Sequence, residues 1–136
     1  MSDKQHDPMG NRTRGIRRVV GRFKPNGSSA ITNTQKSTVF GRGWTVAYTS
    51  TGKYTITISG QYGYYLHGSF ALMSSTITDG GVFRVNSVTF TGGNTVVVLD
   101  HYGEDAAGVR ALEDIAAADG NFITFELVFL NVKEDR

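Results

Sequence analysis

The acidic and imidazole side chains between residues 100 and 119 are the main candidates for catalysis or metal binding in this sequence. Asp100 and His101 are adjacent, and Glu104, Asp105 and Asp119 follow them. Adjacent residues of a β-strand point to opposite faces, so Asp100 and His101 can share a ligand only if a bulge intervenes. The acidic residues also lack the spacing of an EF-hand loop. We therefore expect structural or solvent-exposed roles for these residues, and no metal site.

Other sequence features of enzymes are missing. The chain has no Cys, which excludes a disulfide framework, a thiolate zinc site and a cysteine nucleophile together. It also has no Gly-x-Ser-x-Gly elbow, phosphate-binding loop or His-Glu-x-x-His motif. The 17 glycines fall where turns are expected. We predict a protein that is not an enzyme, with no catalytic residues and no cofactor.

The basic residues near the N-terminus are the first candidates for binding. Residues 1–36 carry eight basic and two acidic side chains, a net charge of +6, whereas residues 37–136 carry six basic and ten acidic ones, a net charge of −4. This asymmetry predicts a basic arm, at residues 1–18, on an acidic body. The candidate partner-binding residues of this basic region are Arg12, Arg14, Arg17, Arg18 and Arg22.

Such an arm can neutralise phosphates of a nucleic acid. It contains no aromatic residues for stacking on bases, however, and the body is acidic. Docking onto an acidic protein surface is an equal or better interpretation, and we do not expect a nucleic-acid partner.

Tyr62, Tyr64 and Tyr65 form an aromatic cluster that is the second candidate for binding. These side chains can stack on a sugar or a base. The alternative is that some pack inside the protein while the others form a subunit interface, where Tyr is enriched. We favour the second interpretation and predict that the three residues contribute to an oligomer interface.

Residues 43–59 contain the clearest structural signal, two strands joined by a turn. β-Branched and aromatic residues alternate with Thr, Ala and Ser on both sides of the turn, which is typical of strands with one buried face. Residues opposite each other share a face, so Val46 must lie opposite Ile56 or Ile58. This requires an odd number of loop residues, or an even number corrected by a bulge. Gly52 is the expected site of a positive φ angle in this turn.

Further strand patterns occupy most of the remaining chain. We predict strands at residues 16–24, 30–40, 64–73, 82–90, 95–102 and 121–132, separated by turns rich in Gly, Pro and Asn. In the strand at 64–73, we expect Leu66, Phe70 and Leu72 to face inward. The strand at 121–132 has four alternating apolar residues on one face, which are Ile123, Phe125, Leu127 and Phe129.

Residues 104–119 are the only candidate for a helix. Val109, Leu112 and Ile115 recur at helical spacing, Gly108 weakens the segment, and Gly120 suits its C-terminal cap. The sum is an all-β protein, an antiparallel β-sandwich or jelly roll of seven or eight strands, with one short helix and an extended N-terminal arm. We assign residues 19–136 to this sandwich domain.

The composition also bears on where the protein acts. No apolar run approaches the ~20 residues of a membrane span, and the polar, basic N-terminus lacks the apolar core of a secretory signal. We therefore expect no membrane partner. The absence of Cys fits a protein made in a reducing cytoplasm.

Four stretches together resemble a known group of proteins. They are Val-Gly-Arg-Phe-Lys-Pro-Asn-Gly-Ser-Ser-Ala at 20–30, Gly-Trp-Thr-Val at 43–46, Thr-Gly-Lys-Tyr-Thr-Ile-Thr at 51–57 and Ile-Thr-Phe-Glu-Leu-Val-Phe-Leu-Asn at 123–131. These stretches resemble small virion proteins of tailed bacteriophages, in which a β-sandwich decorates and cements the capsid. The resemblance spans residues 20–132 and implies no catalytic residues.

The resemblance implies a non-enzymatic cement protein on the capsid surface of the virion, assembled in the host cytoplasm. Its expected partners are the major capsid protein, whose neighbouring subunits it bridges, and its own copies in a dimer or trimer. The alternative function is a receptor- or glycan-binding module of a tail or head fibre, in which the tyrosine cluster and Trp44 contact glycan. A third hypothesis is a nucleic-acid-binding β-barrel.

Overall fold

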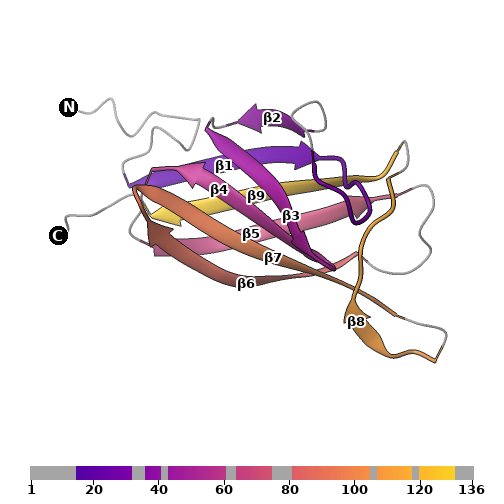
Figure 1. The fold of residues 1–136 in the computed structure, drawn as a ribbon. Helices are drawn as coiled ribbons and strands as arrows, with labels where there is room; N and C mark the ends of the chain where they lie inside the picture. The colour runs from indigo at the N-terminus through magenta and orange to yellow at the C-terminus, as the bar shows by residue number, and fades with distance from the viewer. Residues whose placement is uncertain are drawn as a thin grey trace, which may run out of the picture.

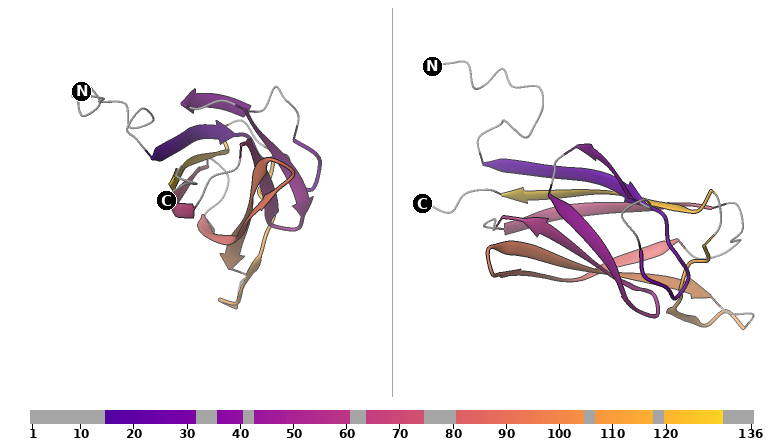
Figure 2. Two further views of the ribbon diagram at one scale, coloured as in Figure 1. Left: turned by 90° about the vertical axis from the view of Figure 1, so that its left-hand side faces the viewer. Right: turned by 45° about the horizontal axis from the view of Figure 1, so that its top comes forward.

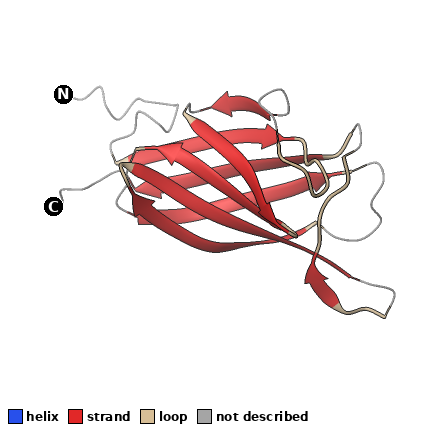
Figure 3. Ribbon diagram, viewed as in Figure 1, coloured by secondary structure: helices blue, strands red, loops and turns tan. Residues whose placement is uncertain are grey.

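The computed structural model describes residues 15–31, 36–40, 43–60, 64–74, 81–104, 107–117 and 120–130, with the backbone alone described for 36–40. These residues contain strands and no helix, as Figure 3 shows by colour. In chain order the strands are β1 (Ile16–Phe23), β2 (Lys36–Phe40), β3 (Trp44–Ser50), β4 (Lys53–Ser59), β5 (Tyr64–Met73), β6 (Val82–Thr91), β7 (Asn94–Glu104), β8 (Arg110–Leu112) and β9 (Phe122–Leu130). The all-β prediction is confirmed.

Two antiparallel sheets pack face to face as a sandwich (Figures 1 and 2). The first sheet has the strand order β2-β1-β9-β5, and the second has the order β3-β4-β7-β6 with β8 paired to β7. Each sheet therefore combines strands that are far apart in the sequence. The edge strands β5 and β6 lie over each other: the ring of Phe70 on β5 is 6.0 Å from the ring of Phe83 on β6, measured between centroids.

The β3–β4 hairpin has a loop with an even number of residues, together with the bulge that such a loop requires. Val46 lies opposite Ile56, and the register shifts by one residue between Tyr48 and Ser50, so that a two-residue loop connects the strands. The bulge keeps the apolar side chains of both strands on the buried face. Gly52 in the loop has the expected positive φ angle, 68°.

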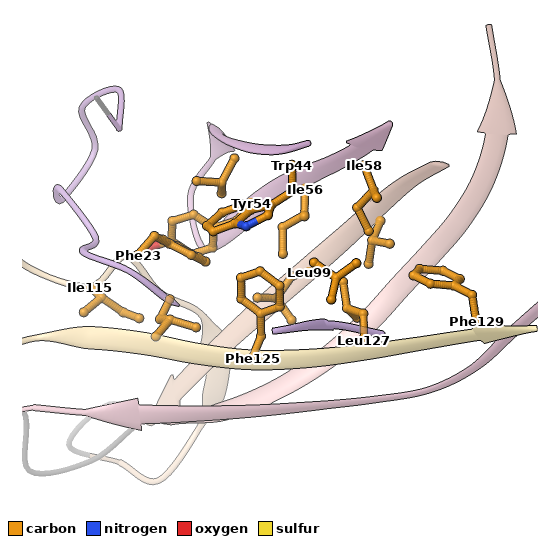
Figure 4. Close-up of a cluster of buried hydrophobic side chains, with 14 residues drawn as sticks. Phe23, Trp44, Tyr54, Ile56, Ile58, Leu99, Ile115, Phe125, Leu127 and Phe129 are labelled. Carbon is orange, nitrogen blue, oxygen red and sulfur yellow. The ribbon is translucent and has the colours of Figure 1, made fainter. Parts of the chain in front are cut away.

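The core lies between the sheets and follows the predicted alternation. The inward side chains of β9, at Ile123, Phe125, Leu127 and Phe129, are almost completely buried. Trp44 of the opposite sheet meets Phe125 edge-on, with 5.0 Å between the ring centroids (Figure 4). Burial of each such side chain contributes about 1.5–3 kcal/mol before entropy is counted. This packing makes the sandwich a rigid support for the side chains on its outer faces.

The prediction for the start of β5 is wrong at one residue. Phe70 and Leu72 are partly buried against the core, but Leu66 is exposed. A register shift between Tyr65 and His67 makes Leu66 the extra residue of a bulge. The bulge reverses the alternation, so Tyr65 turns inward in place of Leu66.

The helix expected at residues 104–119 is also wrong. β7 extends through Glu104, and β8 pairs with it antiparallel after a turn that includes Gly108, with a φ angle of 81°. β7 is longer than its partner β4, so its end would leave unpaired backbone groups, which β8 satisfies. This pairing outweighs a weak helical propensity. The backbone N–H of Glu113 donates to the carbonyl of His101 at 3.0 Å and extends the ladder.

The segment after β8 is held against the β3–β4 hairpin by Asp114. Its carboxylate accepts hydrogen bonds from the Gly52 N–H at 2.8 Å and from the Tyr48 hydroxyl at 3.1 Å. Ile115 follows in the chain and is fully buried. Residues 113–117 are thus ordered by contacts with the sandwich and not by a helix.

Candidate functional site

The arginines predicted to bind a partner are divided by the structure. Arg12 and Arg14 lie outside the described residues, as do residues 1–14 of the expected arm. Arg17, Arg18 and Arg22 belong to β1, which begins at Ile16, so the last residues assigned to the arm are part of the first sheet.

Two of the β1 arginines are engaged by their own sheet. The Nε and Nη2 atoms of Arg18 donate to one carboxylate oxygen of Glu126, at 2.9 and 2.6 Å. Glu126 lies on the neighbouring strand β9. The guanidinium of Arg22 lies over the ring of Phe122, 4.3 Å from its centroid. Both side chains remain at least partly exposed, so they form a fixed, charged outer surface on β1.

The tyrosine cluster is also divided. Tyr62 lies outside the described residues. Tyr64 is 63% exposed, whereas Tyr65 packs against Phe129 with 6.0 Å between the ring centroids. Burial raises the pKa of Tyr65 above its ordinary value. Of these two tyrosines, only Tyr64 presents most of its ring to a partner.

Tyr64 belongs to an apolar row at one end of the first sheet. In the strand register it lies opposite Leu130 of β9, which lies opposite Ile16 of β1. Ile16 begins β1 and Leu130 ends β9, so the segments before β1 and after β9 both attach at this end (Figure 1). The predicted basic arm and an exposed aromatic ring therefore belong to the same end of the sandwich.

The edge strand β5 is unusual for its exposed apolar residues. It is ten residues long, contains no charged residue and ends the strand order of its sheet. Tyr64, Leu66 and Met73 are all about half exposed or more, at 63%, 48% and 54%. Soluble proteins protect long edge strands with charges, Pro, bulges or a covering segment. β5 has the bulge but no Asp, Glu, Lys, Arg or Pro, so only one of these protective features is present within the strand.

Asp100 and His101 lie on opposite faces of β7, as the sequence predicts. Asp100 points to the outer face of the second sheet, and its carboxylate is completely buried beneath its neighbours. It accepts hydrogen bonds from Lys53 at 2.8 Å, Arg84 at 2.9 Å and Asn86 at 2.9 Å. Burial alone would raise the pKa of this carboxyl, but the three donors lower it to about 2.

His101 points inward and connects two loops. Its Nε2 accepts a hydrogen bond from the Gly81 N–H at 3.0 Å, so Nδ1 carries the proton that is donated to the carbonyl of Glu113 at 2.7 Å. Phe83 packs on the imidazole, with 5.1 Å between ring centroids. Both ring nitrogens are therefore occupied by the backbone, which is a structural role.

Sequence reasoning missed the donors that surround Asp100. Lys53 and Arg84 stand directly opposite it, on the two strands that flank β7. The signal was present, because the turn at residues 92–93 makes β6 and β7 a hairpin and Lys53 begins β4. Finding it required knowing that β4 pairs with β7, and that a bulge near Asn86 brings Arg84 into register.

Two further findings concern metals and membranes. Within the described ranges, no three His, Asp or Glu side chains gather in a way that could hold a metal ion. No helix in the part of the chain that the structure describes is long and apolar enough to cross a membrane. Comparison of the chain with protein-family models, curated proteins and solved structures gives no match.

Proposed function

We propose that this protein is a non-enzymatic structural component of a tailed-phage virion, which binds the outside of the capsid and bridges neighbouring major capsid subunits. The resemblance of four stretches of the sequence to capsid cement proteins motivates the proposal. The structural observation that carries it is the uncharged edge strand β5, with exposed Tyr64, Leu66 and Met73. An edge of this kind can pair with a strand of another protein chain.

The two ends of the described chain support adhesion at the same place. Ile16 and Leu130 lie beside Tyr64, so the basic segment before β1 attaches next to the exposed aromatic ring. A rigid body with a charged arm can make many weak contacts at once, and their combined strength exceeds that of each alone. On this proposal the arm contacts an acidic surface of the capsid, while the body contacts its own copies.

The self-contact is proposed to form through β5. Two copies related by a twofold axis can pair their β5 strands antiparallel, which joins two first sheets into one continuous sheet. Because residues 64–73 include no Asp, Glu, Lys or Arg, this pairing brings no like charges of these side chains together. The unpaired backbone groups of β5 would then be hydrogen-bonded in both copies, and its exposed apolar side chains would gain cross-strand neighbours.

Light scattering on the purified protein tests the self-contact. The wild type should have twice the 14.8 kDa molar mass of one chain. Leu66→Lys and Met73→Lys should shift it toward the monomer, because each places a charge on the proposed interface. Ala47→Lys, which changes an exposed residue on the outer face of β3, serves as the matched control. A wild-type monomer, or variants that associate like the wild type, would contradict pairing through β5.

Sedimentation with capsids that lack the protein tests capsid binding itself. We expect the wild type to sediment with the capsids at a fixed ratio to the major capsid protein. Deletion of residues 1–14 should weaken this binding and make it less dependent on salt concentration, because the ion pairs of the arm are removed. A protein that stays in the supernatant at low salt would rule out the cement function.

The second candidate function is a receptor- or glycan-binding module of a phage tail or head fibre. The observation in its favour is Tyr64, whose ring is exposed and available for stacking on a sugar. Glycan-array binding that is lost in Tyr64→Ala, together with copies confined to the tail, would support this function. Tyr65 is unsuitable for the same test, because it packs on Phe129. The expected glycan contact of Trp44 is wrong, because Trp44 is buried in the core against Phe125.

A further inference from the structure

A shallow depression lies on the outer face of the second sheet, away from β5. The residues that line it are Val82, Arg84, Tyr102 and Arg110. They belong to strands β6, β7 and β8, which are labelled in Figure 1. Val82 and Tyr102 stand opposite each other in the strand register. Arg84 lies opposite Asp100 on one side of this row, and Arg110 lies opposite Glu104 on the other. Tyr102 therefore forms the floor between two arginines.

The positive charge on one side of Tyr102 is held in place by the buried Asp100. The carboxylate of Asp100 binds Arg84 and Lys53 together, so one negative charge faces two positive ones. The side chain of Arg84 is 60% exposed although its Nη2 is anchored. Its guanidinium lies 5.8 Å from the centroid of the Tyr102 ring. The surface here thus carries a fixed excess of positive charge beside an aromatic ring, on a body whose net charge is negative.

The positive charge on the other side of Tyr102 is only weakly paired. Arg110 approaches Glu104 at 3.4 Å, and both side chains are about half exposed. An exposed pair of this kind contributes little to stability, because water screens both charges, and it exchanges readily with other partners. Arg110 is therefore able to leave Glu104 for a stronger acceptor in the depression.

We propose that this depression binds a small ligand that carries a carboxylate on a ring, such as an acidic sugar. The ring lies on Tyr102 and Val82, which supply apolar and aromatic surface. The carboxylate accepts hydrogen bonds from Arg110 and from the donors of Arg84 that Asp100 does not use, a geometry that the planar guanidinium favours. This site lies on the opposite sheet from β5 and does not depend on the proposed function.

Three probes and ¹⁵N NMR titration of the full chain test the site. Glucuronate has both the ring and the carboxylate, glucose has the ring alone, and acetate has the carboxylate alone. We expect glucuronate to shift the amide signals of β6, β7 and β8 around Tyr102 with saturation in the low-millimolar range. Glucose and acetate should each bind at least about tenfold more weakly, because each lacks one of the two groups that the depression recognises.

Two variants separate binding by Arg110 from a structural role. Arg110→Gln should weaken glucuronate binding about tenfold, the loss expected for one charged hydrogen bond. Glu104→Gln should tighten it, because it frees Arg110 and removes a competing negative charge. An Arg110 that only supports β8 would not give this opposite pair of effects. No shift with glucuronate, equal binding of acetate, or equal affinity in Arg110→Gln would each overturn the proposal.

Discussion

Replacement of Asp100 by Asn tests whether this buried carboxylate stabilises the protein by binding Lys53 and Arg84 on the outer face of the second sheet. The change keeps the size of the side chain but removes the charge that holds Lys53 and Arg84. It also places an amide N–H against groups that are themselves donors. Because Asp100 is completely buried, breaking its contacts leaves polar groups without partners.

The expected loss follows from two magnitudes. Removing one member of a fully buried ion pair costs about 3–5 kcal/mol. Here Lys53 is 29% exposed and Arg84 is 60% exposed, so water can solvate both cations in the variant. The lowering of the pKa of Asp100 from 3.8 to about 2 also indicates a loss smaller than that of a fully buried pair, since one pKa unit is 1.36 kcal/mol. We expect Asp100→Asn to lower the free energy of unfolding by about 2 kcal/mol at pH 7.

The pH dependence gives a second readout of the same group. The folded pKa of Asp100 is depressed, so its contribution to stability is complete above pH 3.8 and is lost as pH falls toward about 2. Urea unfolding of the wild type and the variant should therefore show a constant gap from pH 7 to about pH 4, which closes between about pH 4 and pH 2.

Glu104→Gln is the matched control, because Glu104 is an acid on the same strand whose ion pair is exposed. Its effect should stay within about 0.5 kcal/mol. A loss in Asp100→Asn as small as in this control, or a gap that persists unchanged at pH 2, would refute the role assigned to Asp100.

Three further predictions concern the turn, the bulge and the buried imidazole. Gly52→Ala should destabilise the protein by more than about 2 kcal/mol in chemical denaturation. Its φ angle is positive, and the new Cβ would meet backbone atoms of Glu113 and His101 at 2.7 and 2.8 Å. Gly92→Ala is the control: its φ angle is 59° and no atom lies within 4 Å, so it should cost only about 1–2 kcal/mol. Thermal unfolding should show a loss of about 2 kcal/mol for Tyr65→Ala and almost none for Tyr64→Ala, whereas equal losses would contradict the bulge at Leu66. His101→Leu should cost about 2–3 kcal/mol, since the Gly81 N–H and the Glu113 carbonyl lose their partner, and a neutral effect would refute the bridging role.

The alternation of β9 and the β3–β4 hairpin could be predicted from sequence because each depends on local periodicity. Ile123, Phe125 and Leu127 share a face wherever the strand lies, and Gly52 has the positive φ angle that the turn needs. These features are properties of short stretches. The pairing of β1 with β9, by contrast, joins residues one hundred or more positions apart, and no local pattern indicates it.

The errors in prediction have the same origin. Leu66 has the spacing from Phe70 that a regular strand would place on the same face, yet Leu66 is itself the extra residue of a bulge and faces outward. The spacing of Val109, Leu112 and Ile115 fits a helix, but hydrogen bonding of β8 to the end of β7 is more favourable. This pairing can be foreseen only when the arrangement of the sheet is known. The contacts of Lys53 and Arg84 with Asp100 could not be predicted from the sequence, because they depend on the register of three strands.

Electron cryomicroscopy of purified virions is the most direct test of the proposed function. The proposed capsid function predicts copies of the two-sheeted body on the outer capsid surface, at the junctions between major capsid subunits, with neighbouring copies in contact through β5. Virions that hold the protein only at the tail, or that do not hold it at all, would contradict the proposed capsid function.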